Sequence, residues 1–380
     1  MGYNDCMKVA LVCDDLIQMG GHEKVVMDFC EIFPEAPLYT TVASKKWSKI
    51  CREKNINLRT SFLQYFPFMK KMNRYYAPFG VYIFALNSFD FSNYDIVISL
   101  SSRFVHGIKT ELNTKHICYM STVGRMFWEP YNYFDGETYG LLSLIKFLAQ
   151  PFLAPFLSAI RVWDYIAGQR PHYFLCNSKT TQSRIKKYYR RDSKIIHPSI
   201  NVEKFIQKKE HLEDDYFLIL TRLVSWKKVD LAIEACKKMN KKLKIVGTGP
   251  ATKELKKLAN GNIEFMGYVS EEKKISLLQN CVALINTQYE DFGIAPLESM
   301  ASGRPVVAFG AGGALETVVC GKTGEFFKEH AVESLVKVLK DFNPTKYSVE
   351  ACQTQANKFN IKHFKQTIKD LIYNIYLDNK

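Results

Sequence analysis

Two glutamates near the C-terminal end of the sequence are spaced so that both could contact one ligand. Glu290 and Glu298 lie eight residues apart. The apolar run 282–285 precedes the pair, and the apolar run 305–309 follows it. This order predicts a strand, a loop that carries Glu290, and a short helix that carries Glu298. Open α/β sheets bind their ligands in such loops, outside the carboxyl ends of the strands.

The turn between the two glutamates predicts a helix start that could bind an anion or a sugar hydroxyl. Phe292 and Gly293 form a flexible turn, and Pro296 suits a first helical turn because proline has no N–H group. The backbone N–H groups of Gly293, Ile294 and Ala295 would then lack partners within the helix. Such donors at the positive end of a helix favour an anionic or hydroxyl-rich ligand. The alternative is that both glutamates are ordinary solvated charges at a helix end.

Two cations occupy a second loop of the same kind. Arg222 and Lys227 lie five residues apart, after a strand predicted at 217–220. A guanidinium offers a planar fork of donors and an ammonium a point charge, and both suit a diphosphate. A solvated lysine face is the alternative, and it fits Lys228 better than Arg222, which leaves a buried strand.

A glycine pair near the N-terminus follows another predicted strand. Residues 7–13 are largely apolar, as in a buried parallel strand, and the apolar spacing over 25–29 predicts a helix. Gly20 and Gly21 lie between the two. A strand, glycine loop and helix could approach a phosphate closely. Two glycines alone fit a plain turn at least as well.

Taken together, these segments resemble the retaining glycosyltransferases of family four, which use nucleotide-sugar donors. The spacing of Glu290 and Glu298 carries the resemblance. So do the G-x-P-V-V sequence at 303–307 and the G-G-x-x-E sequence that ends at Glu316. The resemblance is strongest over 173–325. Within the family, the chain is most similar to bacterial O-antigen mannosyltransferases, which implies GDP-mannose as the donor.

The resemblance implies a GT-B fold, in which two Rossmann-like α/β domains face each other across a cleft. Alternating strands and helices in the C-terminal half independently predict a parallel sheet. We expect an N-terminal acceptor-side domain over 1–199 and a donor-binding domain over 200–356. A C-terminal helix, at about 357–380, is expected to return to the N-terminal domain.

The resemblance also assigns roles to the candidate residues. Arg222 and Lys227 match the family's donor-phosphate motif, so they would stabilise charge on the leaving diphosphate. Glu290 would hold a hydroxyl of the transferred sugar, and Glu298 would accept hydrogen bonds from the ribose. The catalytic group implied in this way is Glu290, Arg222 and Lys227. The donor-binding group is Gly20, Gly21, Tyr268, Val269, Phe292, Gly293, Ile294, Ala295 and Glu298.

On the acceptor side, the chain departs from the family's pattern. Residues 121–129 resemble a motif that begins His-Thr-Pro, but Ser121 stands in place of the histidine and Val123 in place of the proline. The family's histidine usually contacts the transferred sugar. His106 is the nearest histidine in the sequence outside the strand predicted at 116–120. Ser121, Arg125 and His106 are therefore the candidate acceptor or cleft residues.

Composition limits the partners and the compartment. The formal net charge of +14 favours anionic partners: a nucleotide, a phosphate, a nucleic acid or an acidic membrane surface. The ten cysteines are scattered without a C-x-x-C pair, which favours buried free thiols in a reducing compartment. The N-terminus lacks an apolar region of signal-peptide length, so we expect a cytoplasmic protein. There is no Asp-x-Asp sequence, and two cations at the diphosphate make a metal unnecessary. No metal or other cofactor is expected.

Two stretches bear on peripheral contact with a membrane. Residues 62–82 are rich in aromatic and basic side chains. They fit either a core helix pair with a basic outer face or a patch that meets a lipid-linked or polyanionic acceptor. Residues 141–163 are long and apolar enough to raise a spanning helix, but Lys146, Pro151 and Pro155 argue against it. A helix-break-helix segment fits better.

We therefore expect a retaining hexosyltransferase that moves mannose from GDP-mannose to a hydroxyl of a glycan or lipid-linked glycan. Two alternatives stay open. One is another GT-B enzyme, such as a nucleotide-sugar epimerase. The other is a non-catalytic protein that binds a nucleotide-sugar, a glycan or a nucleic acid. Interleaved aromatic and basic residues are too common to support nucleic-acid binding, so no nucleic-acid partner is expected.

Overall fold

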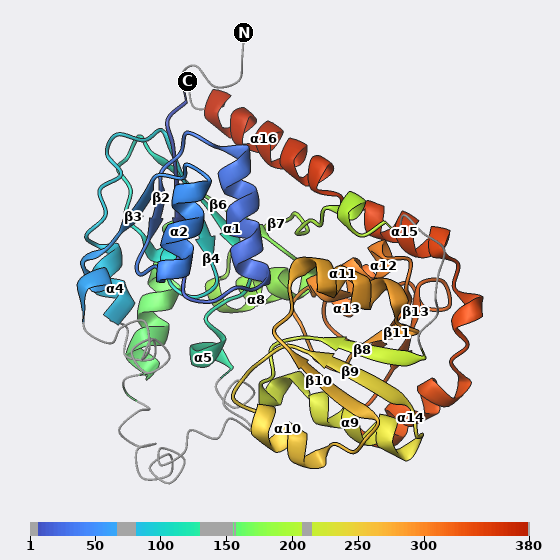
Figure 1. The fold of residues 1–380 in the computed structure, drawn as a ribbon. Coiled ribbons are helices and arrows are strands. Elements are labelled where there is room, and N and C mark those ends of the chain that lie inside the picture. The colour runs from blue at the N-terminus through green and yellow to red at the C-terminus, as the bar shows by residue number, and fades with distance from the viewer. Residues whose placement is uncertain (1–6, 67–80, 130–154, 156, 207–214, 379–380) are drawn as a thin grey trace. The chain divides into compact units, whose positions relative to one another are not determined.

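The computed structural model describes residues 7–66, 81–129, 155, 157–206 and 215–378 (Figure 1). These residues divide into two compact units. Unit 1 contains the described residues up to His197 together with those from Lys362 on, and unit 2 runs from Pro198 to Ile361. The boundaries expected from the sequence were 199/200 and about 356/357.

The described part of unit 1 is built on a parallel sheet with the strand order β3-β2-β1-β4-β5-β6-β7. Its strands are β1 (Val9–Cys13), β2 (Leu38–Thr40), β3 (Leu58–Thr60), β4 (Ile96–Ser101), β5 (Lys115–Met120), β6 (Tyr173–Cys176) and β7 (Lys194–Ile195). In the register, Val12 of β1 lies opposite Tyr39 on one side and Ser99 on the other. The chain builds outward from β1 to β3 and then crosses to β4, so the switch in direction falls between β1 and β4.

Helices cover both faces of this sheet because its strands are apolar on both faces. Alternate residues of β1 show this: Val9, Leu11 and Cys13 lie in one core, whereas Ala10 and Val12 lie in another. The first core is closed by α1 (Gly21–Ile32), α2 (Lys45–Glu53) and α16 (Ile361–Leu377). The second is closed by α4 (Val81–Leu86), α5 (Arg125–Trp128) and the helical residues 157–167.

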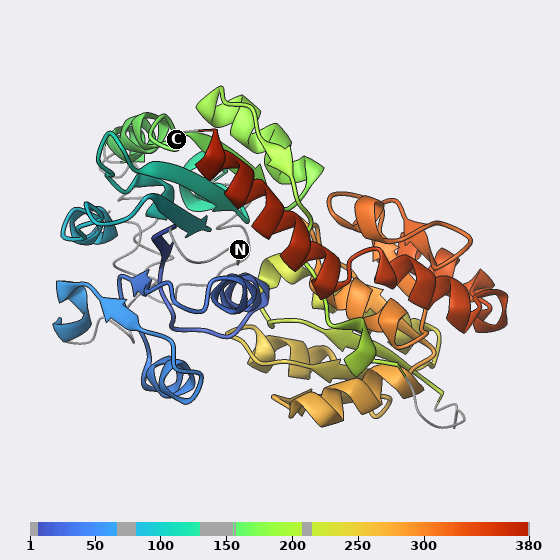
Figure 2. The ribbon, with the colours of Figure 1, turned by 90° about the horizontal axis from the view of Figure 1, so that it is seen from above.

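The C-terminal helix α16 is an integral part of unit 1. It lies beside α1 in both views (Figures 1 and 2). The rings of Phe29 and Phe364 meet edge to face, with centroids 5.9 Å apart. Ile368 and Ile372 of α16 are fully buried in the same core. This helix therefore completes a core that begins at Val9, near the other end of the chain.

Unit 2 is built on a second parallel sheet, with the strand order β10-β9-β8-β11-β12-β13. Its strands are β8 (Tyr216–Leu220), β9 (Lys242–Val246), β10 (Ile263–Gly267), β11 (Ala283–Asn286), β12 (Val306–Phe309) and β13 (Gly324–Phe327). The chain builds outward from β8 to β10 and then crosses to β11 on the other side of β8. The switch point of unit 2 therefore lies between β8 and β11.

Two helical layers also enclose the sheet of unit 2. Leu218 faces a core shared with α11 (Glu271–Asn280), α12 (Ile294–Ala301), α13 (Ala314–Thr317) and α15 (Val349–Asn357). Phe217 and Ile219 face the opposite core, shared with α9 (Val229–Lys238), α10 (Thr252–Leu258) and α14 (Val332–Asp341). Two parallel α/β sheets confirm the predicted fold class, although the sequence did not indicate the short strands β3 and β13.

The two stretches predicted to bear on a membrane are only partly described. Residues 67–80 and 130–154 lie outside the described residues. Within the first stretch, Leu63 and Tyr82 are buried, whereas Phe62, Tyr65 and Phe66 are exposed. Within the second, Ile160 is buried in unit 1. None of the helices that the structure describes has the length and apolar character needed to cross a membrane.

Most cysteines that the structure describes are buried free thiols, as the composition predicts. Nine are described, and Cys320 alone among these is exposed. Burial raises the pKa of the Cys30 and Cys236 thiols to about 12. Such thiols stay protonated at neutral pH and behave as small apolar side chains.

Candidate functional site

The candidate site of unit 2 lies where the strand order changes direction, between β8 and β11. Parallel strands place their carboxyl ends at one edge, so the loops after β8 and β11 emerge side by side. Two hydrogen bonds join these loops. The Thr221 hydroxyl donates to Gln288 Oε1 over 3.0 Å, and the Thr287 hydroxyl donates to the carbonyl of Lys227 over 2.8 Å. The loops therefore form one connected surface.

Lys227 and Glu290, both predicted catalytic residues, form an ion pair across this switch point. Their side chains are only 10% and 18% exposed, respectively. Lys227 ends the short helix η5 (Ser225–Lys227), and its Nζ lies 4.2 Å from the centroid of the Trp226 ring. The indole face and the carboxylate thus fix an ammonium group at the sheet edge. The interpretation of Glu290 as a solvated charge is wrong, because the side chain is mostly buried and paired.

The glycines after β12 let a third loop pack on the Glu290 loop. The Gly313 N–H donates to the carbonyl of Glu290 over 2.9 Å. A Cβ on Gly312 would lie 2.3 Å from that carbonyl oxygen, and a Cβ on Gly313 would lie 2.2 Å from the Cα of Phe292. No larger residue fits at either position without moving the backbone. The G-G-x-x-E sequence therefore has a steric reason, which is close contact between two loops.

Helix α12 starts beside the ion pair, as the sequence predicts. It begins at Ile294, with Gly293 before it at a φ of 88° and Pro296 in its first turn. A Cβ on Gly293 would lie 2.7 Å from Glu290 Oε2, so the Gly293 backbone lies against the carboxylate. The first N–H groups of a helix have no intrahelical partner. Donors from the helix start and the Lys227 ammonium thus both lie next to Glu290.

Glu298, the second predicted glutamate, is buried and paired with a residue that sequence reasoning missed. Its side chain is 8% exposed, and its Oε1 accepts a hydrogen bond from Lys274 Nζ over 3.1 Å. Glu271 also contacts Lys274, over 3.0 Å. Burial by itself would lower the pKa of Lys274, but the two carboxylates raise it above its ordinary value. Glu298 is therefore buried, paired with a lysine and held in place, which contradicts a solvated helix-end charge.

The other donor-side candidates differ in what they present to a ligand. Arg222 is exposed and lies two residues after the end of β8, on the same edge as Lys227. Tyr268 is 74% exposed and Val269 is half-buried, both after β10. Phe292 is different: its side chain is 4% exposed and packs in the core against Phe359. The phenyl ring of Phe292 therefore supports the loop, and a ligand could contact only its backbone.

The glycines after β9 allow close packing against the loop after β8. A Cβ on Gly247, whose φ is +135°, would lie 1.8 Å from the Thr221 carbonyl oxygen. A Cβ on Gly249 would lie 2.0 Å from the Leu223 carbonyl oxygen. Both glycines thus press against the loop that carries Arg222. Their tight turn holds the Arg222–Lys227 segment in place.

In unit 1, the predicted glycine pair leads into a contact with Ser121. Gly20 precedes α1, and Gly21 is its first residue. The next residue, His22, approaches Ser121 from α1, and its Nδ1 lies 2.9 Å from the Ser121 hydroxyl. Ser121 follows β5 directly. The structure thus brings together Gly21 and Ser121 through His22, a residue that sequence reasoning did not select.

Asp14 holds together the switch point of unit 1. It follows β1, is 4% exposed, and accepts hydrogen bonds from the backbone N–H groups of residues 102 to 105. The Ser102 hydroxyl adds a fifth bond, over 3.0 Å. Burial by itself would raise the pKa of Asp14, but Arg103, His22 and the backbone donors bring it below its ordinary value. The neighbouring Asp15 pairs with Arg103.

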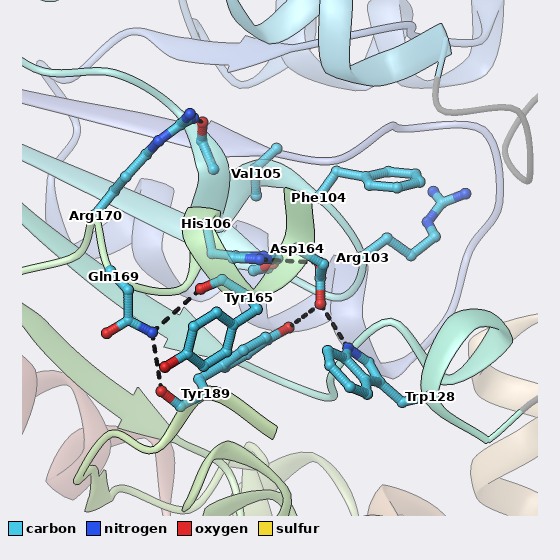
Figure 3. Close-up of polar contacts among 12 residues, drawn as sticks. Arg103, Phe104, Val105, His106, Trp128, Asp164, Tyr165, Gln169, Arg170 and Tyr189 are labelled. Carbon is cyan, nitrogen blue, oxygen red and sulfur yellow. Dashed lines mark hydrogen bonds and ion pairs between the residues drawn. The ribbon is translucent and has the colours of Figure 1, made fainter. Parts of the chain in front are cut away.

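His106 does not reach a surface of unit 1, which contradicts its prediction as an acceptor-side residue. It is fully buried, and its Nε2 lies 3.2 Å from the equally buried Asp164 (Figure 3). Asp164 Oδ2 accepts hydrogen bonds from Trp128 Nε1 over 2.7 Å and from the Tyr189 hydroxyl over 2.8 Å. This network joins four segments of the core. A substrate cannot contact His106 without displacing them.

Arg125, the remaining acceptor-side candidate, lies in a cluster of charges. Its Nε is 3.5 Å from Glu129, one turn later on the chain. Glu129 also accepts a hydrogen bond from Arg184 Nε, over 2.8 Å. Arg125 therefore balances a carboxylate that another arginine shares. Over the described ranges, no three or more His, Cys, Asp or Glu side chains gather in a way that could hold a metal ion.

The sequence of unit 2 is similar to sequences of known glycosyltransferases. Residues 201–359 match the family described as glycosyl transferases group 1. The chain is 29% identical over 252 residues to alpha-1,3/1,6-mannosyltransferase ALG2 of Dictyostelium discoideum, covering 52% of this chain and 60% of that protein. It is 26% identical over 193 residues to D-rhamnosyltransferase WbpZ of Pseudomonas aeruginosa, covering 47% and 48%. The matches thus span about half the length of these curated relatives.

Comparison with solved structures covers nearly the whole chain. HepE of Anabaena, solved in complex with UDP, superposes with a TM-score of 0.73 at 16% identity, covering 97% of this chain and all of that one. Sucrose-phosphate synthase of Thermosynechococcus elongatus superposes with a TM-score of 0.70 at 12% identity. At such identities the likeness concerns the fold, and both neighbours are GT-B proteins. The chain therefore has the GT-B fold, and the part of it that forms most of unit 2 matches the glycosyl transferases group 1 family.

Proposed function

We propose that the protein is a retaining hexosyltransferase that takes a sugar from a nucleoside diphosphate donor and passes it to a hydroxyl acceptor. The observation that carries the proposal is the Lys227–Glu290 ion pair at the switch point of unit 2. It combines a cation suited to a diphosphate with a carboxylate suited to a sugar hydroxyl. The match of residues 201–359 to the glycosyl transferases group 1 family supports the same activity.

The donor would be bound by groups from several loops. Lys227 and Arg222 would hold the diphosphate and stabilise the charge that develops as it leaves. Glu290 would accept a hydrogen bond from a hydroxyl of the transferred sugar and so orient its anomeric carbon. The N–H donors at the start of α12 would add contacts to the phosphate or the sugar. No metal is needed in this arrangement, because two cations face the diphosphate.

The nucleoside would lie along α11 and α12. Glu298, fixed by Lys274, would accept hydrogen bonds from the ribose hydroxyls. A carboxylate that already has one partner keeps further lone pairs for such bonds. The exposed Tyr268 and the neighbouring Val269 would contact the base. Gly20 and Gly21 stay candidates for a donor contact from unit 1.

Mannose carried by GDP is the donor that we favour. The sequence resembles mannosyltransferases, and the curated relatives include mannosyltransferases from several eukaryotes. A D-rhamnosyltransferase is also similar, and the solved structure of HepE contains UDP. These differences make the sugar and the base the first questions for experiment.

The acceptor would be a glycan or a lipid-linked glycan at the cytoplasmic side of a membrane. Exposed aromatic side chains on unit 1 support peripheral contact with a lipid surface. They are Phe62, Tyr65, Phe66 and Phe84. Phe62 and Tyr65 lie on η1 (Phe62–Tyr65), Phe66 follows it, and Phe84 lies on α4. All four therefore fall between positions 62 and 84 of the sequence. We propose no nucleic-acid partner.

Two measurements on one donor panel test the proposal. Thermal unfolding with GDP-mannose, UDP-glucose, UDP-galactose or UDP-N-acetylglucosamine identifies the donor, because a ligand that binds only the folded state raises Tm. Release of GDP or UDP, with and without a chelator, then measures turnover. We expect one donor to raise Tm and to be turned over in both conditions. Binding without any nucleotide release would favour a non-catalytic binder, and product formation from the donor alone, without release, would favour an epimerase.

A further inference from the structure

The side chains of His22 and Ser121 are hydrogen-bonded to each other. His22 is the second residue of α1, immediately after the glycine pair. Its Nδ1 lies 2.9 Å from the Ser121 hydroxyl, which follows β5. Strand β1, which leads to His22, and strand β5 both belong to the parallel sheet of unit 1. The imidazole therefore lies at the carboxyl edge of that sheet, where open α/β sheets bind ligands.

Ser121 is held firmly enough to orient the ring. Its N–H donates to the carbonyl of Ser101 over 2.8 Å. Its carbonyl accepts from the side chains of Asn177, over 2.7 Å, and Thr181, over 3.2 Å. Three neighbouring segments thus fix the backbone that carries the hydroxyl. With the Ser121 end fixed, the hydrogen bond selects one orientation of the His22 ring.

The other ring nitrogen of His22 has no hydrogen-bond partner in the described part of the chain, although the atom is buried. A buried polar atom of this kind costs free energy unless a ligand or water satisfies it. The Thr122 hydroxyl, next to Ser121, is in the same condition. A residue bonded to Ser121 and the residue after Ser121 thus each present an unsatisfied polar atom. Both are of the type that bonds a hydroxyl group.

The surrounding charges indicate that the partner of His22 is neutral. Asp14 and Glu23 both lie close enough to His22 and Arg103 to interact with them electrostatically. Asp15 interacts with Glu23 in the same way. Glu23 and Asp14 are less than 6% exposed. Three carboxylates against one arginine disfavour a phosphate, which carries negative charge itself. A sugar hydroxyl can donate to or accept from an imidazole without such repulsion.

We propose that His22 Nε2 forms a hydrogen bond with a hydroxyl group of a sugar substrate, and that Ser121 is the residue that positions the ring. This inference rests on the proposed function, because it assumes a sugar in the reaction. The sugar is either the one carried by the nucleotide donor or the one at the acceptor end. In a neutral imidazole one ring nitrogen donates a hydrogen bond and the other accepts one. The bond from Nδ1 to Ser121 therefore also sets the role of Nε2, and a change of Ser121 affects both nitrogens.

The test compares variants in two reactions. The first is nucleotide release into water from the donor that stabilises the parent protein most. The second is transfer from the same donor to octyl α-D-mannopyranoside. We expect His22→Ala and Ser121→Ala to lower kcat/KM by about three- to tenfold, the effect of one hydrogen bond to a neutral group. Ser121→Thr keeps the hydroxyl and should retain most of the activity.

A loss in the first reaction assigns His22 to the donor sugar, and a loss in the second alone assigns it to the acceptor sugar. No loss in either reaction overturns the inference. His363→Ala, which changes an exposed histidine on α16, is the matched control and should behave like the parent. Binding of GDP and UDP, which carry no sugar substrate, should be unchanged in the His22 and Ser121 variants.

A double exchange gives a second, independent check. In the variant His22→Ser with Ser121→His, the imidazole moves to the other end of the same hydrogen bond. We expect this variant to recover part of the activity that either single exchange loses. If the parent turns over no donor at all, the proposed function fails, and the inference fails with it. If the parent is active and every His22 and Ser121 variant is equally active, only the inference fails.

Discussion

Lys227 and Glu290, 63 residues apart in sequence, pair their side chains at the point where the sheet of unit 2 changes direction. The Glu290 loop packs against Gly312 and Gly313. The Lys227 loop is held by the Thr287 hydroxyl, which donates to the Lys227 carbonyl. Because the pair is mostly buried, removing one partner leaves the other charge poorly compensated. A ligand that carries both negative phosphates and neutral hydroxyls can satisfy the two groups together.

Replacing Lys227 tests the cation. Lys227→Met keeps the length and the apolar stem of the side chain but removes the charge. We expect the affinity for the matching nucleoside diphosphate to fall by about tenfold or more, since a charged hydrogen bond contributes roughly 1.5–3 kcal/mol. Isothermal titration with GDP and UDP measures it. Lys253→Met, on the exposed side of α10, is the control and should bind as the parent does. Equal affinities in the two variants would contradict the role of Lys227.

Gly313 tests the close packing of two loops. In Gly313→Ala the new Cβ would lie 2.2 Å from the Cα of Phe292, so the Glu290 loop must move. We expect a loss of roughly 1–3 kcal/mol in unfolding free energy, the usual effect of overpacking, together with loss of nucleotide release. Gly261→Ala is the control, because a Cβ there would meet nothing within 4 Å. Urea unfolding measures the unfolding free energy of both variants. A stable and fully active Gly313→Ala variant would show that the loops tolerate separation.

Asp14 should make the stability of unit 1 depend on pH. Its pKa is below the ordinary value of 3.8 in the folded protein. A carboxyl with a lowered pKa stabilises the fold above that ordinary value, and the contribution is lost as pH falls through the folded pKa. Asp14→Asn cannot accept all five hydrogen bonds. We expect it to unfold at lower urea concentration than the parent at pH 7, with the difference shrinking below pH 3.8. A difference that stays constant with pH would contradict the ionised state of Asp14.

Helix α16 should carry a large part of the stability of unit 1. Ile368 is fully buried against β1 and α1, so Ile368→Ala removes apolar contacts and leaves a cavity. Substitutions of this kind cost about 2–5 kcal/mol. Urea unfolding followed by tryptophan fluorescence, to which Trp47 of the same core contributes, measures the change. Lys369→Ala, at the exposed next position, should be nearly neutral. Similar stabilities for both variants would mean that α16 is not part of the folding unit.

The sequence predicted the elements of the fold well because both sheets are parallel and buried. Their strands read as short apolar runs, and the start of the helix that carries Glu298 is marked by Gly293 and Pro296. Short strands at sheet edges, β3 and β13, lack such runs. The C-terminal helix was expected on unit 1 only through the resemblance, since its partner strand, β1, lies at the other end of the sequence.

The sequence predicts individual residues of the candidate site but not the pairs that they form. The sequence selected Lys227, Glu290 and Glu298, but gave no reason to join Lys274 to Glu298 or His22 to Ser121. Those contacts depend on which loops the topology places together. His106 was selected only because it lies near Ser121 in sequence, and in the folded chain it is fully buried. Proximity in sequence is a poor guide where parallel strands bring distant loops to one edge.

The central claim is that the Lys227–Glu290 pair binds and activates a nucleoside diphosphate sugar. Its most direct test is the rate of nucleotide release from the donor that raises Tm most, compared between the parent protein and Glu290→Gln. The substitution keeps the shape of the side chain and removes its charge. We predict that the parent releases nucleotide and that the variant is slower by about 10²–10³, by analogy with the loss of one preorganised transition-state contact. A variant that folds, binds the donor and releases nucleotide as fast as the parent would contradict the claim.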